Sequence, residues 1–221
     1  MGLLAVSGAS GKTGWRVVQE ALGRGWSVRA IVRPDSELPE GLEGAEVVRL
    51  ELGDGPALRA ALEGVDALVI ATGARPSIDL TGPLRVDALL VRAQAEACQA
   101  AGVRRLVLVS SLCSGRWLHP LNLFGLILLW KGLGERWLAG SGLDWTVIRP
   151  GGLNENEENL EAQGIRFSGP DQQESNSIPR RLVARVTLDA LDDPAAIGRI
   201  IEITSGEAVP RQELSRWLQA A

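Results

Sequence analysis

The sequence contains no tyrosine, one histidine, His119, and two cysteines, Cys98 and Cys113, among its 221 residues. A single imidazole excludes a site built from several histidines, and two thiols are too few for a disulfide framework or a structural zinc site. We therefore expect a protein of the reducing cytoplasm, and we expect it to hold no resident metal. The absence of tyrosine also removes the phenol as a general acid for any reaction that the protein performs.

Long apolar runs and a surplus of basic residues are also missing. The longest apolar stretch, residues 123–130, is interrupted by Gly125 and is far shorter than the roughly 20 residues that span a bilayer. The N-terminus lacks the basic start and long apolar segment of a secretory signal, so we expect none. The net charge of -4 and a pI of about 5.2 disfavour a protein that binds nucleic-acid phosphates.

Apolar residues make up 45% of the chain, which is enough for the core of one domain over residues 1–221. Short apolar stretches alternate with helix-like ones, and this order predicts an α/β fold with a doubly wound parallel sheet, the Rossmann fold, with helices on both faces. Expected strands cover 2–8, 27–33, 46–52, 66–74, 104–112, 144–152 and 199–205. Expected helices cover 14–25, 56–64, 84–102, 126–140, 180–193 and 211–221.

Residues 153–178 interrupt this alternation with a polar segment. Its acidic residues are Glu155, Glu157, Glu158, Glu161, Asp171 and Glu174. Two interpretations stay open, a solvated loop and a mobile lid over a site at the strand ends.

The stretch "VSGASGKTGW", residues 6–15, predicts a phosphate-binding loop between a strand and a helix. A triphosphate loop ending in Gly-Lys-Thr would need glycine at position 6, where this chain has Val6. The spacing of Gly8, Gly11 and Gly14 instead matches a dinucleotide loop, with one glycine each for the tight turn, the approach of the pyrophosphate and the packing of the helix on the sheet. The expected cofactor-binding residues of the loop are Gly8, Ser10, Gly11, Lys12, Thr13 and Gly14.

The end of the second expected strand indicates which dinucleotide binds. NAD sites usually have an acidic residue there, whereas this chain has Arg33, followed by Pro34 and Asp35. A guanidinium suits a 2'-phosphate, which a carboxylate would repel, and we expect Pro34 to turn Asp35 away. Lys12 offers a second positive charge. We therefore expect NADP(H) to be preferred over NAD(H).

Several motifs together resemble one family, the atypical short-chain dehydrogenases/reductases with a Gly-x-x-Gly-x-x-Gly loop. The chain is similar to the small NAD(P)-binding proteins of cyanobacteria and chloroplasts in the Tic62-related and NmrA-like group. The matching stretches are "SGASGKTG" (7–14), "DALVIATGA" (66–74), "AAGVRRLVLVSSL" (100–112), "HPLNLFG" (119–125), "LLWKGLGERWLAGSGLDWTVIRPGGL" (128–153) and "IPRRLVA" (178–184).

This resemblance implies roles for further residues. Ser111 matches the active-site serine, and Lys131 matches the lysine that bonds the nicotinamide ribose. The other implied cofactor contacts are Glu51 and Leu52 beside the adenine, Ala71, Thr72 and Gly73 along the cofactor, and Pro150, Gly151 and Gly152 beside the nicotinamide.

The chain departs from the family at two catalytic positions. The best-known members have a tyrosine four residues before the lysine, and this chain has Ile127 there. Ala93 stands where relatives often have asparagine. The standard general acid is therefore absent.

Two functions from different classes remain. One is an oxidoreductase that reduces a conjugated acceptor such as a quinone, flavin or tetrapyrrole, because such acceptors can take their proton from water. The other is a non-catalytic NADP(H)-binding redox sensor or assembly factor with a protein partner, and an epimerase or isomerase is a third option. Ser111, Lys131, Cys113 and His119 are the polar candidates near the site, while Trp117, Trp130 and residues 118–129 could form a substrate pocket, core or a surface patch.

Overall fold

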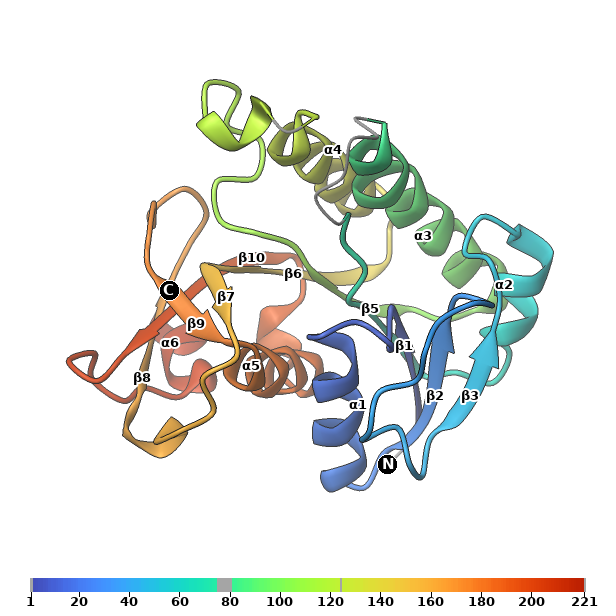
Figure 1. The fold of residues 1–221 in the computed structure, drawn as a ribbon, viewed down its shortest axis with the longest axis horizontal. Coiled ribbons are helices and arrows are strands. Elements are labelled where there is room, and N and C mark those ends of the chain that lie inside the picture. The colour runs from blue at the N-terminus through green and yellow to red at the C-terminus, as the bar shows by residue number, and fades with distance from the viewer. Residues whose placement is uncertain (1, 75–80, 124, 221) are drawn as a thin grey trace.

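An eight-stranded sheet forms the middle layer of the fold, with the strand order β3-β2-β1-β4-β5-β6-β10-β8 (Figure 1). This computed structural model describes residues 2–74, 81–123 and 125–220. The strands are β1 (Leu3–Ser7), β2 (Ser27–Val32), β3 (Glu46–Arg49), β4 (Ala67–Ile70), β5 (Arg105–Val109), β6 (Asp144–Pro150), β8 (Gly164–Ser168) and β10 (Arg199–Gly206). All neighbours are parallel except β8, which is antiparallel to β10.

Helices cover both faces of this sheet, as Figure 1 shows. One face is covered by α1 (Gly14–Gly23), α5 (Arg180–Asp192) and α6 (Leu214–Ala220). The other is covered by α2 (Gly55–Ala61), α3 (Leu90–Ala101) and α4 (Ile127–Ala139). The predicted doubly wound α/β fold is confirmed.

The side chains of each central strand point alternately to the two faces of the sheet, and this produces two separate hydrophobic cores. In β4, Val69 packs with the α1 and α5 side of the sheet, while Leu68 and Ile70 pack with the α2 and α3 side. Successive side chains of a strand point to opposite faces, so a strand covered on both faces is apolar throughout. This explains why the central strands are continuous apolar runs in the sequence.

The order of the strands creates the site. The chain runs from β1 outward to β2 and β3 and then returns to place β4 on the other side of β1. In such sheets, ligands bind outside the carboxyl ends of the strands where the order reverses. The Ala71 amide donates to the Ser7 carbonyl at 3.0 Å, so the chain segments that leave β1 and β4 stay together at this point.

Two regions differ from the sequence prediction. The helix expected over 84–102 begins as a π-helix, η1 (Leu84–Leu89), before it continues as α3. The polar segment 153–178 contains β8 and parts of a small parallel pair, β7 (Gly152–Asn154) and β9 (Ser177–Pro179), with a short helix, η3 (Leu160–Ala162). Packing of Phe167 holds β8 in place, because its buried ring stacks on Trp217 of α6 with 6.0 Å between ring centroids.

Short 3-10 helices complete the described chain, η2 (Pro120–Leu123) and η4 (Pro194–Ala196). Within the described ranges, none of the helices combines the length and apolar character needed to cross a membrane.

Candidate dinucleotide site

The glycine loop between β1 and α1 has a closed, tight backbone. Gly8 adopts a φ of 73°, a left-handed conformation that glycine adopts without strain. The Gly11 amide donates to the Gly8 carbonyl at 2.9 Å, and the Trp15 amide donates to the Gly11 carbonyl at 3.1 Å. The loop therefore turns directly into α1, whose N-terminus favours an anion.

Gly14 has a different role from the one expected. We expected it to let the helix approach the sheet, but its nearest neighbours belong to the loop itself. A Cβ on Gly14 would overlap with the Gly8 carbonyl oxygen and lie 2.9 Å from the Ala9 Cα. The first turn of α1 thus packs against the backbone of its own loop, and Gly14 permits that contact.

Arg33 follows β2 directly and lies exposed at the rim of the site. Within the part of the chain that the structure describes, its guanidinium forms no hydrogen bond or ion pair. Arg49 supports the turn around it by donating to the carbonyl oxygens of Pro34 at 2.6 Å and Ser36 at 3.0 Å. Ser10 of the glycine loop bonds the Ser36 hydroxyl at 3.1 Å, so the turn and the loop are joined. No pattern in the sequence singles out Arg49 for this position.

One cavity of about 310 Å³ lies at the switch point of the sheet. It brings together most of the residues predicted from the first half of the chain. Its lining includes Gly8, Ser10, Gly11, Arg33, Leu52, Ala71, Thr72 and Gly73, with Ile31, Val32, Ala74, Gly82, Val86 and Leu90. The exposed Glu51 and the residues Lys12, Thr13 and Gly14 do not line it.

Lys131 lies in the second turn of α4 and forms an ion pair with Asp87 of η1, at 2.7 Å between Nζ and Oδ1. The side chains of Lys131 and Asp87 are 13% and 1% exposed. A methyl group placed on Gly73 would lie 4.0 Å from both Lys131 Nζ and Asp87 Oδ1, so the pair adjoins the lining of the cavity. The family resemblance implies Lys131 as a site residue, whereas Asp87 is not among the residues predicted from the sequence.

The carboxyl ends of β5 and β6 bring the remaining predicted residues together. The Leu112 amide donates to the Pro150 carbonyl at 2.9 Å, which places Ser111 beside the turn of Gly151 and Gly152. A Cβ on Gly151 would overlap with the Asn176 carbonyl oxygen, so this glycine admits the chain before β9. The Ser111 hydroxyl bonds the Leu112 carbonyl at 3.1 Å.

A buried ionic network supports this edge of the sheet. Arg149 of β6 donates to Glu135 of α4, with 2.7 Å between Nη2 and Oε2, and Glu135 also accepts from the Ser110 hydroxyl at 2.5 Å. Glu202 of β10 lies 3.5 Å from Arg149 and accepts the amides of residues 171–173 at 2.8–3.0 Å. Burial disfavours the charge on Arg149, but Glu135, Asp171 and Glu202 outweigh burial and raise the pKa of Arg149. The network fixes α4, β5 and β6 relative to one another.

A family model described as NAD(P)H-binding matches residues 8–194. The chain belongs to this NAD(P)H-binding family. The predicted resemblance to the Tic62-related atypical reductases is confirmed as well. The chain is 27% identical to the chloroplastic protein TIC 62 of Arabidopsis thaliana over 98% of its own length and 38% of that longer protein.

Other relatives match over about two thirds or more of the chain. An uncharacterised chloroplastic protein of Arabidopsis thaliana is 34% identical, covering 94% of this chain and 78% of its own. Sanguinarine reductase of Eschscholzia californica is 30% identical, covering 67% of this chain and 68% of its own.

Solved structures share the fold. A Bacillus halodurans protein described provisionally as an NAD-dependent epimerase/dehydratase superposes with a TM-score of 0.87 and 25% identity, over all of both chains. The protein ChuY of Escherichia coli O157:H7, described as an anaerobilin reductase, has a TM-score of 0.77 and 24% identity, over 94% of this chain and 99% of its own.

The residues of the site fit the family's dinucleotide. Buried polar atoms without a partner require an explanation, because each loses the hydrogen bond that water would supply. Thr72 Oγ1 in the lining and Asp87 Oδ2 beside it are buried, and neither has a hydrogen-bond partner among the described residues. These two unpaired polar atoms thus lie at the cavity lined by the glycine loop, whose turn into a helix N-terminus favours phosphate.

Lys12 points toward the polar segment rather than into the cavity. It forms an ion pair with Glu155, and the buried Arg16 of α1 forms one with Glu157. Arg181 of α5 also pairs with Glu157 at 3.3 Å. Burial opposes ionisation of Glu157, but the bond from Arg16 and the charges of Arg181 and Arg16 lower its pKa. The start of segment 153–178 is therefore tied to α1 and α5.

The other polar candidates have structural surroundings. The Cys113 thiol is buried, and His119 Nδ1 accepts the Leu121 amide at 3.2 Å in its own turn. Ile127, at the position of the family tyrosine, packs with Leu112, Cys113 and Leu128.

Most of the apolar segment before α4 is exposed rather than forming a pocket. Leu118 is fully exposed, and Trp117 and Leu123 are 70% and 84% exposed. Phe124 of this segment lies outside the described residues.

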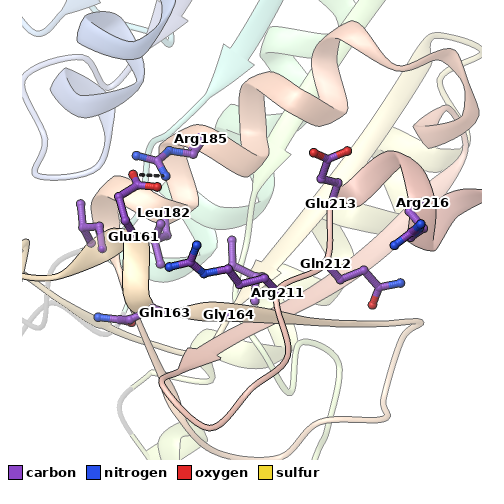
Figure 2. A pocket seen from close by; sticks show the side chains of 11 residues that line it. Glu161, Gln163, Gly164, Leu182, Arg185, Arg211, Gln212, Glu213 and Arg216 are labelled. Atoms are coloured by element: carbon purple, nitrogen blue, oxygen red, sulfur yellow. Dashed lines mark hydrogen bonds and ion pairs between the residues drawn. The ribbon is translucent and has the colours of Figure 1, made fainter.

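Figure 2 shows a second hollow, of about 630 Å³, between η3, β8, α5 and the chain before α6. Its charged lining is mixed, with Glu161 paired to Arg185 at 3.2 Å and with Arg211 and Arg216 nearby. It shares no lining residue with the cavity at the switch point, so it is not part of the dinucleotide site.

Proposed function

We propose that the protein is an NADP(H)-dependent oxidoreductase that reduces a conjugated small-molecule acceptor without a tyrosine acid. The observation that supports this most is the Lys131–Asp87 pair beside Gly73, at the edge of the cavity that the glycine loop and Arg33 line. A site that only held the adenosine half of a dinucleotide would not need this buried pair. NADPH, when bound, supplies a hydride from its nicotinamide ring.

The proposed preference for NADP(H) rests on Arg33. Its exposed guanidinium lies at the rim of the cavity and has no acidic partner among the described residues. Guanidinium groups bind phosphate through charge-assisted, often bidentate hydrogen bonds. We therefore assign Arg33 to the 2'-phosphate.

The proposed class of acceptor follows from the missing acid. Ile127 cannot donate a proton, so we propose an acceptor that can take its proton from water, such as a quinone, a flavin or a tetrapyrrole. In this proposal, the Ser111 hydroxyl binds an acceptor oxygen and Lys131 binds the nicotinamide ribose. One relative is named sanguinarine reductase, and we extend only the reductase class to this chain.

A non-catalytic NADP(H)-binding sensor or assembly factor is the second candidate. The observation in its favour is Ile127, which packs into a small apolar cluster where the family has its acid. Both candidates fit the cytoplasm, since Cys98 and Cys113 are free thiols.

The test is NADPH consumption against a panel of quinones, flavins and linear tetrapyrroles. Cofactor binding is followed in the same samples by energy transfer from the seven tryptophans to NADPH. Saturable turnover with one acceptor is expected and would define its class. Tight binding of NADPH without turnover of any acceptor would contradict the reductase and favour the sensor.

A further inference from the structure

Asp87 is a buried carboxylate that uses only one of its two oxygens. Oδ1 accepts from Lys131 at 2.7 Å, while Oδ2 is buried and has no hydrogen-bond partner in the described part of the chain. The side chain is 1% exposed and thus lies in the interior together with its charge partner. An ionised carboxylate accepts several hydrogen bonds, and leaving a buried charged oxygen unbonded is costly. The free oxygen therefore points to a ligand.

The surroundings of Asp87 place that ligand in the dinucleotide site. Its neighbours Val86 and Leu90 line the cavity at the switch point. On the other side, the position of a methyl group on Gly73, also a lining residue, is 4.0 Å from Oδ1. Asp87 also lies within the π-helix η1, a wider turn that is frequent at functional sites.

The chemistry of the pair restricts what it can bind. A carboxylate only accepts hydrogen bonds and an ammonium only donates them. Side by side, they suit a group that does both, and a vicinal diol is such a group. A phosphate is disfavoured at the free oxygen, because it would meet the negative charge of Asp87 there. Among the groups of a dinucleotide that both donate and accept, the ribose of the nicotinamide half is the one that the proposed function places on Lys131.

We propose that Asp87 is a cofactor-binding residue, whose Oδ2 accepts a hydrogen bond from a hydroxyl of the nicotinamide ribose while Oδ1 holds Lys131 against the same sugar. This rests on the proposed NADP(H) binding but not on turnover. The proposal gives the ribose a hydrogen-bond acceptor, Asp87. This residue lies outside the glycine loop and is neither the expected serine nor the expected lysine.

The test compares two ligands that share one half. Dissociation constants for NADP⁺ and for 2',5'-ADP, which lacks the nicotinamide ribose, are measured by calorimetry on the unaltered chain and on Asp87→Asn. A hydrogen bond to a charged group predicts a loss of about tenfold to a hundredfold in affinity for NADP⁺. The affinity for 2',5'-ADP should stay unchanged, because the 2'-phosphate and adenine contacts remain.

Glu63→Gln is the matched control, since Glu63 is an exposed carboxylate in the turn after α2, and it should change neither constant. An equal loss for both ligands in Asp87→Asn would show general damage to the fold and would overturn the inference. Unchanged NADP⁺ affinity would overturn it too, as would a failure of the unaltered chain to bind NADP⁺. Absence of turnover with every acceptor, with the selective loss intact, would contradict only the reductase.

Discussion

Gly134 of α4 packs directly on the backbone carbonyl of Asp87. A Cβ on Gly134 would overlap with that oxygen and lie 3.3 Å from the Asp87 carbonyl carbon and 3.4 Å from the Ala88 Cα. The two helical segments therefore touch through their backbones, which brings Lys131, one turn before Glu135 in α4, within reach of the Asp87 carboxylate. Gly132 similarly packs on Gly115, with 2.7 Å from its Cβ position to the Gly115 Cα.

Gly134→Ala should separate α4 from η1 and weaken the fold. The extra methyl group has no room, and overpacking of this kind costs about 1–3 kcal/mol of unfolding free energy. Urea unfolding measures the loss. Gly23→Ala in α1 is the control, because nothing lies within 4 Å of its Cβ position, and it should leave stability unchanged or slightly higher. Equal effects of the two substitutions would contradict the close packing.

Arg149→Met should destabilise the protein strongly. It leaves Glu135 and Glu202 buried, 4% and 0% exposed, without their cation, and breaking a buried pair costs about 3–5 kcal/mol. Adding Glu135→Gln should restore part of this loss, because one of the uncompensated charges is removed. Arg104→Met is the control, since Arg104 is 71% exposed and its pair with Asp144 should contribute less than about 1 kcal/mol. If the double variant lost as much unfolding free energy as the two single variants together, Arg149 and Glu135 would not be coupled.

Arg33→Ala should weaken NADPH binding far more than NADH binding. Loss of a charge-assisted bond to the 2'-phosphate predicts about a tenfold or greater increase in the NADPH dissociation constant and little change for NADH. Fluorescence titration measures both constants. Arg59→Ala, an exposed arginine of α2, should alter neither. Equal losses of affinity for the two cofactors would show that Arg33 does not bind the 2'-phosphate.

The Cys98 thiol should resist alkylation in the folded protein. Burial raises its pKa to about 12, so at pH 8 only roughly one thiol in ten thousand is the reactive thiolate. Burial raises the pKa of Cys113 too, against the opposing charge of Arg116. Mass spectrometry after iodoacetamide treatment at pH 8 should show Cys98 unmodified in buffer and modified in denaturant. Rapid labelling of Cys98 in buffer would disprove its burial.

The same shift has a consequence for stability at high pH. Between about pH 9 and 12, Cys98 ionises in the unfolded chain but keeps its proton in the folded one. The unfolded state then binds fewer protons, so the Cys98 contribution to unfolding free energy falls as pH rises through this range. Cys98→Ala should reduce that slope.

Much of the fold could be predicted because its signals are local. The strand that enters the glycine loop and the spacing of Gly8, Gly11 and Gly14 define β1, the turn and α1 within one short stretch. The segment that holds β8 gave no such signal, because only Ile165 and Phe167 are apolar there and the strand depends on packing against β10 and Trp217.

The site was predicted less completely, since its pairs come from distant parts of the chain. No spacing rule joins Asp87 to Lys131, 44 residues later, and the contact exists only because α4 crosses η1. One signal was available for the ionic network. Arg149 follows Val147 and Ile148 directly, and Glu202 stands between Ile201 and Ile203, and a charge among such apolar residues of a strand indicates a buried partner of opposite sign.

The backbone of the glycine loop is held by contacts within the loop itself. The Gly8–Gly11 hydrogen bond and the contact of Gly14 with Gly8 fix its backbone through the loop's own atoms. Ordering a flexible loop on association costs conformational entropy, and a loop that is already ordered avoids this cost. We therefore expect the pyrophosphate half of the site to be preorganised, so that rearrangement on binding is confined to the side chains around it.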